Sequence, residues 1–225
     1  MIGWLLFVST VLLLGAAAAG AAGPQQLRLD PGKEQIKLTA GGQAAAREVV
    51  LRRSDLGSTA WRGGAVTPDL SGGPRCATYQ PKQSDLVLTG AARSRYARSL
   101  VVFDNEVQVL KTRRMVRVDW QRTVLDPRVL PCARQTLLQQ LGGGVKLVSF
   151  RIVPFPRLSP YARKYRAIVS SPTGGSRARV VADIVLVGRS RTEITLSAAA
   201  PAAAAGPLAL SEVRIARTLL ARVRT

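Results

Sequence analysis

The side chains best suited to chemistry in this sequence form two short clusters of cationic and aromatic residues. The first cluster comprises Arg93, Arg95, Tyr96 and Arg98, and the second comprises Arg163, Lys164 and Arg166 beside Tyr161 and Tyr165. Arginine presents paired N–H donors that match phosphate and carboxylate oxygens, so both clusters are candidate sites for an anionic ligand. A solvated strand face is the alternative, because a net charge of +20 by itself supports only non-specific attraction.

Catalytic chemistry is restricted by the absence of histidine from the 225 residues. Without histidine, neither a Ser-His-Asp nor a Cys-His nucleophile system can form, and two cysteines are too few for a four-cysteine zinc site. The acids Asp55, Asp85 and Asp119 have no second acid at a telling spacing. Asp55 and Asp85 each follow a serine and suit turns, and Asp119 is positioned to pair with Arg122 on its own helix. We therefore expect a non-catalytic protein without metal or cofactor.

The N-terminal residues indicate export. No charged side chain precedes Arg28, and the apolar run from Trp4 to Leu14 is followed by small residues that offer A-x-A-like cleavage sites. We predict a signal peptide over residues 1–22, with an uncleaved membrane anchor over residues 2–22 as the alternative. A secreted or extracytoplasmic location is oxidising, so it favours a disulfide between Cys76 and Cys132.

The pattern of apolar residues predicts a single α+β domain over residues 39–225, after a linker or arm over residues 23–38. In chain order we expect a helix over 43–53 capped by Thr39, a hairpin of two strands turning at Arg98 and Ser99, two helices from 112 to 141, four strands from 145 to 199 and a final helix. Residues 63–76 read as a Gly/Pro-rich loop. The expected fold is an antiparallel β-sheet of about six strands with helices packed against it.

Two stretches show the periodicity most clearly. Val116, Trp120 and Val124 recur at four-residue spacing, which places Trp120 in the core and turns the arginines of residues 114–122 mostly toward water. This placement, together with export, disfavours nucleic acid as the partner. In residues 101–110, valines and a phenylalanine alternate with Asp104, Glu106 and Gln108, which is typical of a half-buried strand.

Several short phrases carry a family resemblance: LRRSDLGSTAW, SDLVLTG, DWQRTV and GRSRTEITL, with Cys76 and Cys132 between them. In this layout the sequence resembles small secreted actinobacterial proteins, the extracellular sensor domains of mycobacterial serine/threonine kinases and, more distantly, the PsbP-like fold. The resemblance covers most of residues 40–224, and it implies a non-catalytic ligand-sensing or accessory domain.

These observations predict an exported, non-catalytic ligand-binding or accessory domain at the cell envelope. Its expected partner is an acidic envelope component or a small anionic ligand, and a membrane surface stays open as a partner. A hydrolase or transferase that uses carboxylates alone is one alternative, and two acids about 5 to 10 Å apart in a cleft would favour it. A lipid carrier is another, and it would need a large apolar cavity under a curved sheet.

Overall fold

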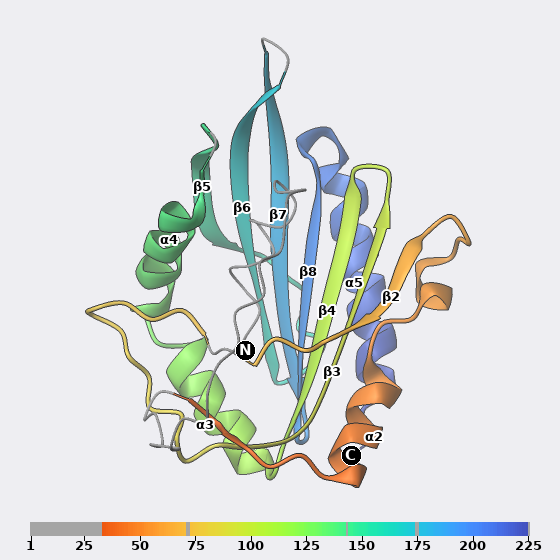
Figure 1. Cartoon of the computed structure of the whole chain (residues 1–225), viewed down its shortest axis with the longest axis vertical. Coiled ribbons are helices and arrows are strands. Elements are labelled where there is room, and N and C mark those ends of the chain that lie inside the picture. Colours follow the sequence, from red (N-terminus) through yellow and green to blue (C-terminus); the bar gives the residue numbers. More distant parts are fainter. Residues whose placement is uncertain (1–32, 71–72, 143, 174–175, 225) are drawn as a thin grey trace, which may run out of the picture.

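An eight-stranded sheet forms the centre of the computed structural model, which describes residues 33–70, 73–142, 144–173 and 176–224. The predicted signal peptide and most of the predicted linker lie outside the described residues. The strands are β1 (Gln35–Ile36), β2 (Arg62–Val66), β3 (Val87–Arg98), β4 (Val101–Leu110), β5 (Lys146–Val153), β6 (Tyr161–Thr173), β7 (Ser176–Arg189) and β8 (Thr192–Pro201). Their order across the sheet is β1–β3–β4–β8–β7–β6–β5, with β2 also paired to β3 (Figure 1).

Helices cover both faces of this sheet. They are α2 (Ala40–Val49), α3 (Arg113–Thr123), α4 (Val129–Gln140) and α5 (Ala205–Ala221), with short 3-10 turns η1 (Arg53–Leu56) and η2 (Ala202–Ala204). Helices α2 and α5 share a core with one face of the sheet, whereas α3 and α4 share a second core with the other face. In Figure 1, α3 and α4 lie toward the left of the sheet, and α2 and α5 lie toward the right.

The α+β class is confirmed, but the prediction of about six strands is too low. The two additional strands are β1, which pairs parallel to β3 over two residues, and β2, which pairs antiparallel to β3. A two-residue strand is too short to show alternation. Strand β2 begins one residue before the predicted Gly/Pro-rich loop, and its sequence RGGAV has almost no side chains to alternate. Backbone pairing with β3 makes both segments strands.

The β3–β4 hairpin turns where the sequence predicts, between Arg98 and Val101. Ser99 adopts a left-handed backbone conformation with φ of 52°, as a tight hairpin turn requires. The register shifts between Leu88 and Gly90, which places an irregularity next to the expected bend. The structure also confirms that Trp120 is a core residue, with 2% of its surface exposed.

Helix α2 begins three residues earlier than predicted and lies unusually close to the sheet. Thr39 caps it as expected, because its side chain accepts a hydrogen bond of 3.0 Å from the Gly42 N–H. A Cβ atom on Gly90 would lie 2.0 Å from the Gly42 carbonyl oxygen, so backbone meets backbone at this crossing. Any side chain at either glycine would therefore push α2 away from β3.

The disulfide between Cys76 and Cys132 is present, with 5.8 Å between the two Cα atoms. It ties the segment before β3 to the first turn of α4. Among the described residues, no helix is both long and apolar enough to span a bilayer.

Strand β4 departs from the half-buried pattern that its alternation predicts. Phe103, Val107 and Val109 join the core under α2 and α5, as expected. The polar residues of the opposite face, Asp104, Glu106 and Gln108, are buried as well. Neighbouring groups cover this polar face, because Arg93 binds Asp104 and the Asp69 backbone N–H donates to Glu106 at 3.2 Å.

Candidate functional site

The structure separates the members of each predicted cluster. Side chains in a strand alternate between the two faces of a sheet, so Arg93 and Arg95 point to the face covered by α3 and α4. Tyr96 joins the opposite core under α2 and α5, and the Arg98 guanidinium lies over the Trp61 ring there, 5.1 Å from its centroid. No single surface of the molecule therefore presents all four residues together.

Arg93 is already matched with carboxylates inside the protein. Its guanidinium donates two hydrogen bonds of 2.8 Å to the two carboxylate oxygens of Asp104, and Glu106 lies 4.0 Å away. This bidentate contact raises the pKa of Arg93. Arg95 also has an interaction partner within the molecule.

The second cluster is divided in the same way. Arg163 donates to the Val124 carbonyl on the α3 side, at 2.9 Å. Lys164 and Arg166 point the other way, toward α5. Whether residues of either cluster bind a ligand stays a prediction, and Arg98 and Arg163 are the members whose described contacts involve no carboxylate.

A buried ionic network holds Lys164 and Arg166. Arg166 binds both oxygens of Asp183, at 2.7 and 2.6 Å, and the Lys164 ammonium lies 2.8 Å from Asp183 and also pairs with Glu212 of α5. Burial by itself raises the pKa of Asp183, but hydrogen bonds from Arg166 and Lys164 outweigh it and lower that pKa. Burial raises the pKa of Glu212 to about 8. The network therefore fastens β6 and β7 to α5.

A cavity of about 340 Å³ lies where α2 meets the end of α5 and the β7–β8 turn. Residues from four segments line it: Gly41, Ala44, Ala45, Glu48 and Val49; Val109; Ser190, Arg191 and Thr192; and Arg222, Val223 and Arg224. We call it the α2–α5 cavity. Valines and alanines contribute the apolar part of its lining, whereas three arginines and one glutamate contribute the charge.

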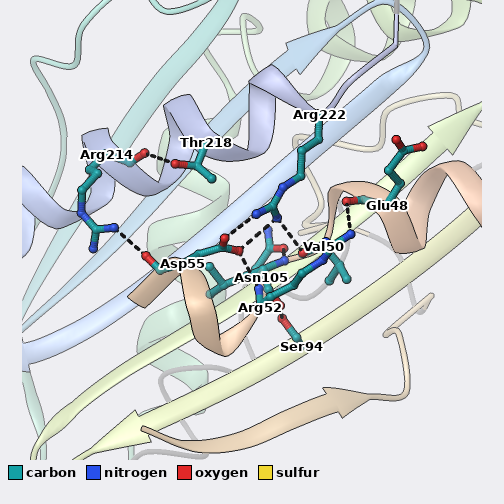
Figure 2. Close-up of polar contacts among 10 residues, drawn as sticks. Glu48, Val50, Arg52, Asp55, Ser94, Asn105, Arg214, Thr218 and Arg222 are labelled. Atoms are coloured by element: carbon teal, nitrogen blue, oxygen red, sulfur yellow. Dashed lines mark hydrogen bonds and ion pairs between the residues drawn. The ribbon is translucent and has the colours of Figure 1, made fainter. Parts of the chain in front are cut away.

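Asp55 fixes the position of Arg222, which lines the α2–α5 cavity, and Figure 2 shows the contacts between the two side chains. Its carboxylate accepts hydrogen bonds from the Arg52 backbone N–H at 2.8 Å and from both terminal nitrogens of Arg222. The Asp55 carbonyl accepts a hydrogen bond from Arg214, at 2.5 Å. One acid thus joins η1 to the C-terminal half of α5 and neutralises one of the three arginines that line the cavity.

The other two arginines of the cavity are less constrained. Arg224 contacts Glu48 at 3.1 Å, but 84% of its side chain is exposed, so water screens this pair. Within the part of the chain that the structure describes, the Arg191 side chain has neither a hydrogen bond nor an ion pair. Arg191 follows Ser190, whose left-handed conformation closes the two-residue turn between β7 and β8. The cavity thus offers one arginine without an acid partner among the described residues, Arg191, and one in a solvent-screened pair, Arg224, beside an apolar wall.

The amino-acid sequence alone does not predict this cavity. Of its residues, Arg222 and Arg224 fall in the predicted final helix, and Ser190 and Arg191 fall within the stretch predicted to form four strands. No periodicity links positions 41, 109, 191 and 223, since only the sheet brings them together. The one local feature that points to this site is a short turn containing an arginine between two predicted strands.

The predicted acids lie apart from one another. Asp55 pairs with Arg222, and Asp85 binds Arg122 at 2.6 and 3.0 Å. The expected pairing of Asp119 with Arg122 is wrong, because α3 turns Asp119 inward, where Gln83 donates to it at 3.2 Å. The described residues hold no group of three or more acids or cysteines arranged for a metal ion.

Further acids are buried between α3 and the sheet. Glu193 of β8 is 4% exposed, and neither of its oxygens has a hydrogen-bond partner among the described residues. Burial, and then the nearby charge of Asp119, raise the pKa of Glu193. Burial also raises the pKa of Glu106, and that of Glu34 to about 7. The carboxylate-only enzyme would need these groups to reach a substrate, and it stays an untested alternative.

No family model matches this chain, and no curated protein matches it. Among solved structures the chain is similar to LpqN, a protein described as involved in cell envelope biogenesis of Mycobacterium tuberculosis. The two share 13% sequence identity over 70% of this chain and 76% of LpqN, with a TM-score of 0.31. A similarity at this level identifies neither a family nor a function. The resemblance to kinase sensor domains and to the PsbP-like fold stays a prediction.

Proposed function

We propose that this protein is an exported, non-catalytic binding or accessory domain of the cell envelope, and that it binds an acidic partner through the α2–α5 cavity. The observation that carries the proposal is the position of Arg191, a guanidinium without a carboxylate partner among the described residues, at a cavity of about 340 Å³. Arginine without an internal partner keeps its full capacity for bidentate binding of phosphate or carboxylate.

The composition of the cavity supports a ligand with an anionic group and an apolar portion. Arg191 and Arg224 would contact the anionic group, and Val49, Val109 and Val223 would contact the apolar portion. Arg222 would serve as a fixed wall, because Asp55 already holds its guanidinium. Export is supported by the apolar N-terminal sequence and by the disulfide, which suits an oxidising compartment.

The test uses polyglycerol phosphate as the polyanion and glycerol phosphate as its small counterpart. We expect an Arg191→Gln/Arg224→Gln variant to bind either probe at least about tenfold more weakly than the unmodified protein, which corresponds to a loss of about 1.4 kcal/mol. An Arg62→Gln/Arg217→Gln variant is the matched control, since both side chains are exposed and the same charge is removed. Titration calorimetry at two salt concentrations measures both, because bulk attraction weakens as salt rises.

Equal losses of affinity in the two variants would contradict binding at the cavity and would attribute the binding to bulk charge alone. An Arg98→Gln/Arg163→Gln variant adds a comparison with the strand residues predicted from sequence. If that variant alone loses affinity, the ligand site lies on the strands and not in the cavity.

A further inference from the structure

One long segment of the chain contains cations but no acids. Residues 127–182, which span α4, β5 and β6, contain no aspartate or glutamate. The same segment contains ten cations: Arg128, Arg134, Lys146, Arg151, Arg157, Arg163, Lys164, Arg166, Arg177 and Arg179. Within the described residues, acids from outside the segment pair with three of these cations. Asp126 pairs with Arg128, Asp183 pairs with Lys164 and Arg166, and Glu212 also pairs with Lys164.

Four of these cations lie exposed on or next to α4 and β5. They are Arg134 on α4, Lys146 and Arg151 on β5, and Arg157 just after β5. Within the described part of the chain none of the four forms a hydrogen bond or an ion pair through its side chain. We call these four residues the basic rim.

Large apolar side chains are exposed in the same region. Leu138 of α4 is 45% exposed, and Val148 and Ile152 of β5 are 50% and 45% exposed. A groove of about 640 Å³ is lined by Leu130, Pro131, Arg134, Gln135, Leu138, Gln139 and Phe150. Phe150 and Ile152 lie on the same side of β5, opposite Ala167 and Tyr165 of β6, so the apolar surface continues from the groove along the strand.

We propose that the surface formed by the groove, Ile152 and the basic rim docks onto a lipid bilayer that contains anionic lipids. This proposal goes beyond the α2–α5 cavity, since it uses other residues. The groove and Ile152 lie on the α3–α4 face, and Lys146 and Arg151 project from the opposite side of β5, the edge strand of the sheet. Charge complementarity supports it, because an acid-free surface meets no repulsion from anionic head groups. Each Lys or Arg near such a membrane is attracted to its anionic head groups, and buried apolar side chains add to this attraction.

A bilayer fits this surface better than an acidic protein does. Long cationic side chains on one side of an edge strand and aliphatic ones on the other match the layered chemistry of a membrane, where anionic head groups lie above hydrocarbon. An acidic protein could pair with the cations of the basic rim, but it would also have to present an apolar ridge that fits the groove. Both interpretations of the apolar residues 2–22, a secretion signal and an anchor, also bring the domain to a membrane.

Co-sedimentation with vesicles tests the proposal, using phosphatidylcholine alone or with about one third phosphatidylglycerol. We expect the full chain without residues 1–22 to bind the anionic vesicles and not the neutral ones. An Arg134→Gln/Lys146→Gln/Arg151→Gln variant should bind at least about tenfold more weakly. Its control, Arg62→Gln/Arg113→Gln/Arg217→Gln, removes the same charge from exposed residues elsewhere and should lose less than about threefold.

A second pair of variants tests the apolar contact. Leu138→Ser/Ile152→Ser should abolish the binding that persists at high salt, whereas Leu100→Ser/Leu210→Ser, at sites 75% and 76% exposed, should not. Equal losses in a variant and its control overturn the proposal, and so does the absence of binding to anionic vesicles. The Arg191→Gln/Arg224→Gln variant should still bind vesicles, so failure of the cavity and failure of the membrane surface give different results. Displacement from vesicles by soluble glycerol phosphate would also overturn the proposal.

Discussion

Cations at one end of the sheet are paired with acids of the same chain, whereas exposed cations at the other end are not. Around β3, β4 and α5, arginines face acids of the same chain: Arg93 binds Asp104, and Arg222 binds Asp55. Around α4 and β5, the exposed cations have no acid within their own segment. The difference shows that a net charge of +20 is not evenly available to a partner. Paired cations hold elements together, whereas unpaired cations are available to bind something else.

Asp183 lies at the boundary between these regions. It is the first acid after the acid-free segment, and it binds both Lys164 and Arg166. A single carboxylate from outside the acid-free segment thus pairs with one buried and one partly buried cation of that segment.

We expect the largest effect from Asp183→Asn. The substitution leaves Lys164 and Arg166 with Glu212 as their only acid among the described residues, in a buried site, so it should lower the free energy of unfolding by about 3 to 5 kcal/mol. Urea denaturation followed by tryptophan fluorescence measures the loss. Asp126→Asn, which removes an acid from the exposed pair with Arg128, should leave the denaturation midpoint unchanged. Equal midpoints for the two variants would show that the buried network does not stabilise the fold.

A smaller effect is expected from Asp55→Asn, at the other end of the sheet. Asp55 accepts from Arg222 and from the Arg52 N–H, and loss of these charged hydrogen bonds should cost about 1 to 3 kcal/mol. Glu48→Gln is the control, because Arg224, its partner, is mostly exposed. If the control loses as much stability as Asp55→Asn, burial does not distinguish the two ion pairs.

The smallest effect is a dependence of stability on pH. Burial raises the folded-state pKa values of four acids, so the folded protein retains protons that the unfolded chain releases: Glu34, Glu106, Glu193 and Glu212. Their stabilising contribution is complete below the usual glutamate pKa of 4.5 and declines as pH rises, toward about 7 for Glu34 and about 8 for Glu212. We expect the free energy of unfolding to fall as pH rises from 5 to 7.

Substitution of a single acid identifies the source of this slope. Glu193→Gln should flatten it, whereas Asp126→Asn should not, because the pKa of Asp126 is lowered and lies below this range. Denaturation midpoints measured at half-unit steps of pH provide the comparison. A free energy of unfolding that rises between pH 5 and 7 would contradict the assignment of this dependence to the buried glutamates.

Local periodicity was enough to predict much of the fold but not how its charges pair. The stripe through Trp120 and the β3–β4 hairpin depend on neighbours within a few residues, and both are confirmed. Arg122 binds Asp85, 37 positions earlier, instead of Asp119 on its own helix. Whether a polar face is solvated, as for Asp104 and Glu106, also depends on elements that are remote in the sequence.

The candidate site was harder to predict for the same reason. Alternation within a strand would have separated Arg93 from Tyr96, and Arg163 from Lys164, had it been applied to those clusters. The α2–α5 cavity could not be predicted in this way, because Gly41, Arg191 and Arg222 meet only after α2 and α5 have packed on the same face. The Gly42–Gly90 contact that allows α2 to lie so close is likewise visible only in three dimensions.

The unequal edges of the sheet have a consequence for solubility. Strands β1 and β2 cover the outer side of β3, whereas β5 pairs only with β6 and leaves its other side without a partner strand among the described residues. Unpaired strand edges are templates for intermolecular sheet growth and aggregation. The register of β5 is irregular at Val148, Lys146 and Arg151 are exposed along it, and Pro154 and Pro156 follow its end. A second copy aligning its own β5 here would face like charges and a strand that soon ends, so the cations of this edge also protect the protein from self-assembly into fibres.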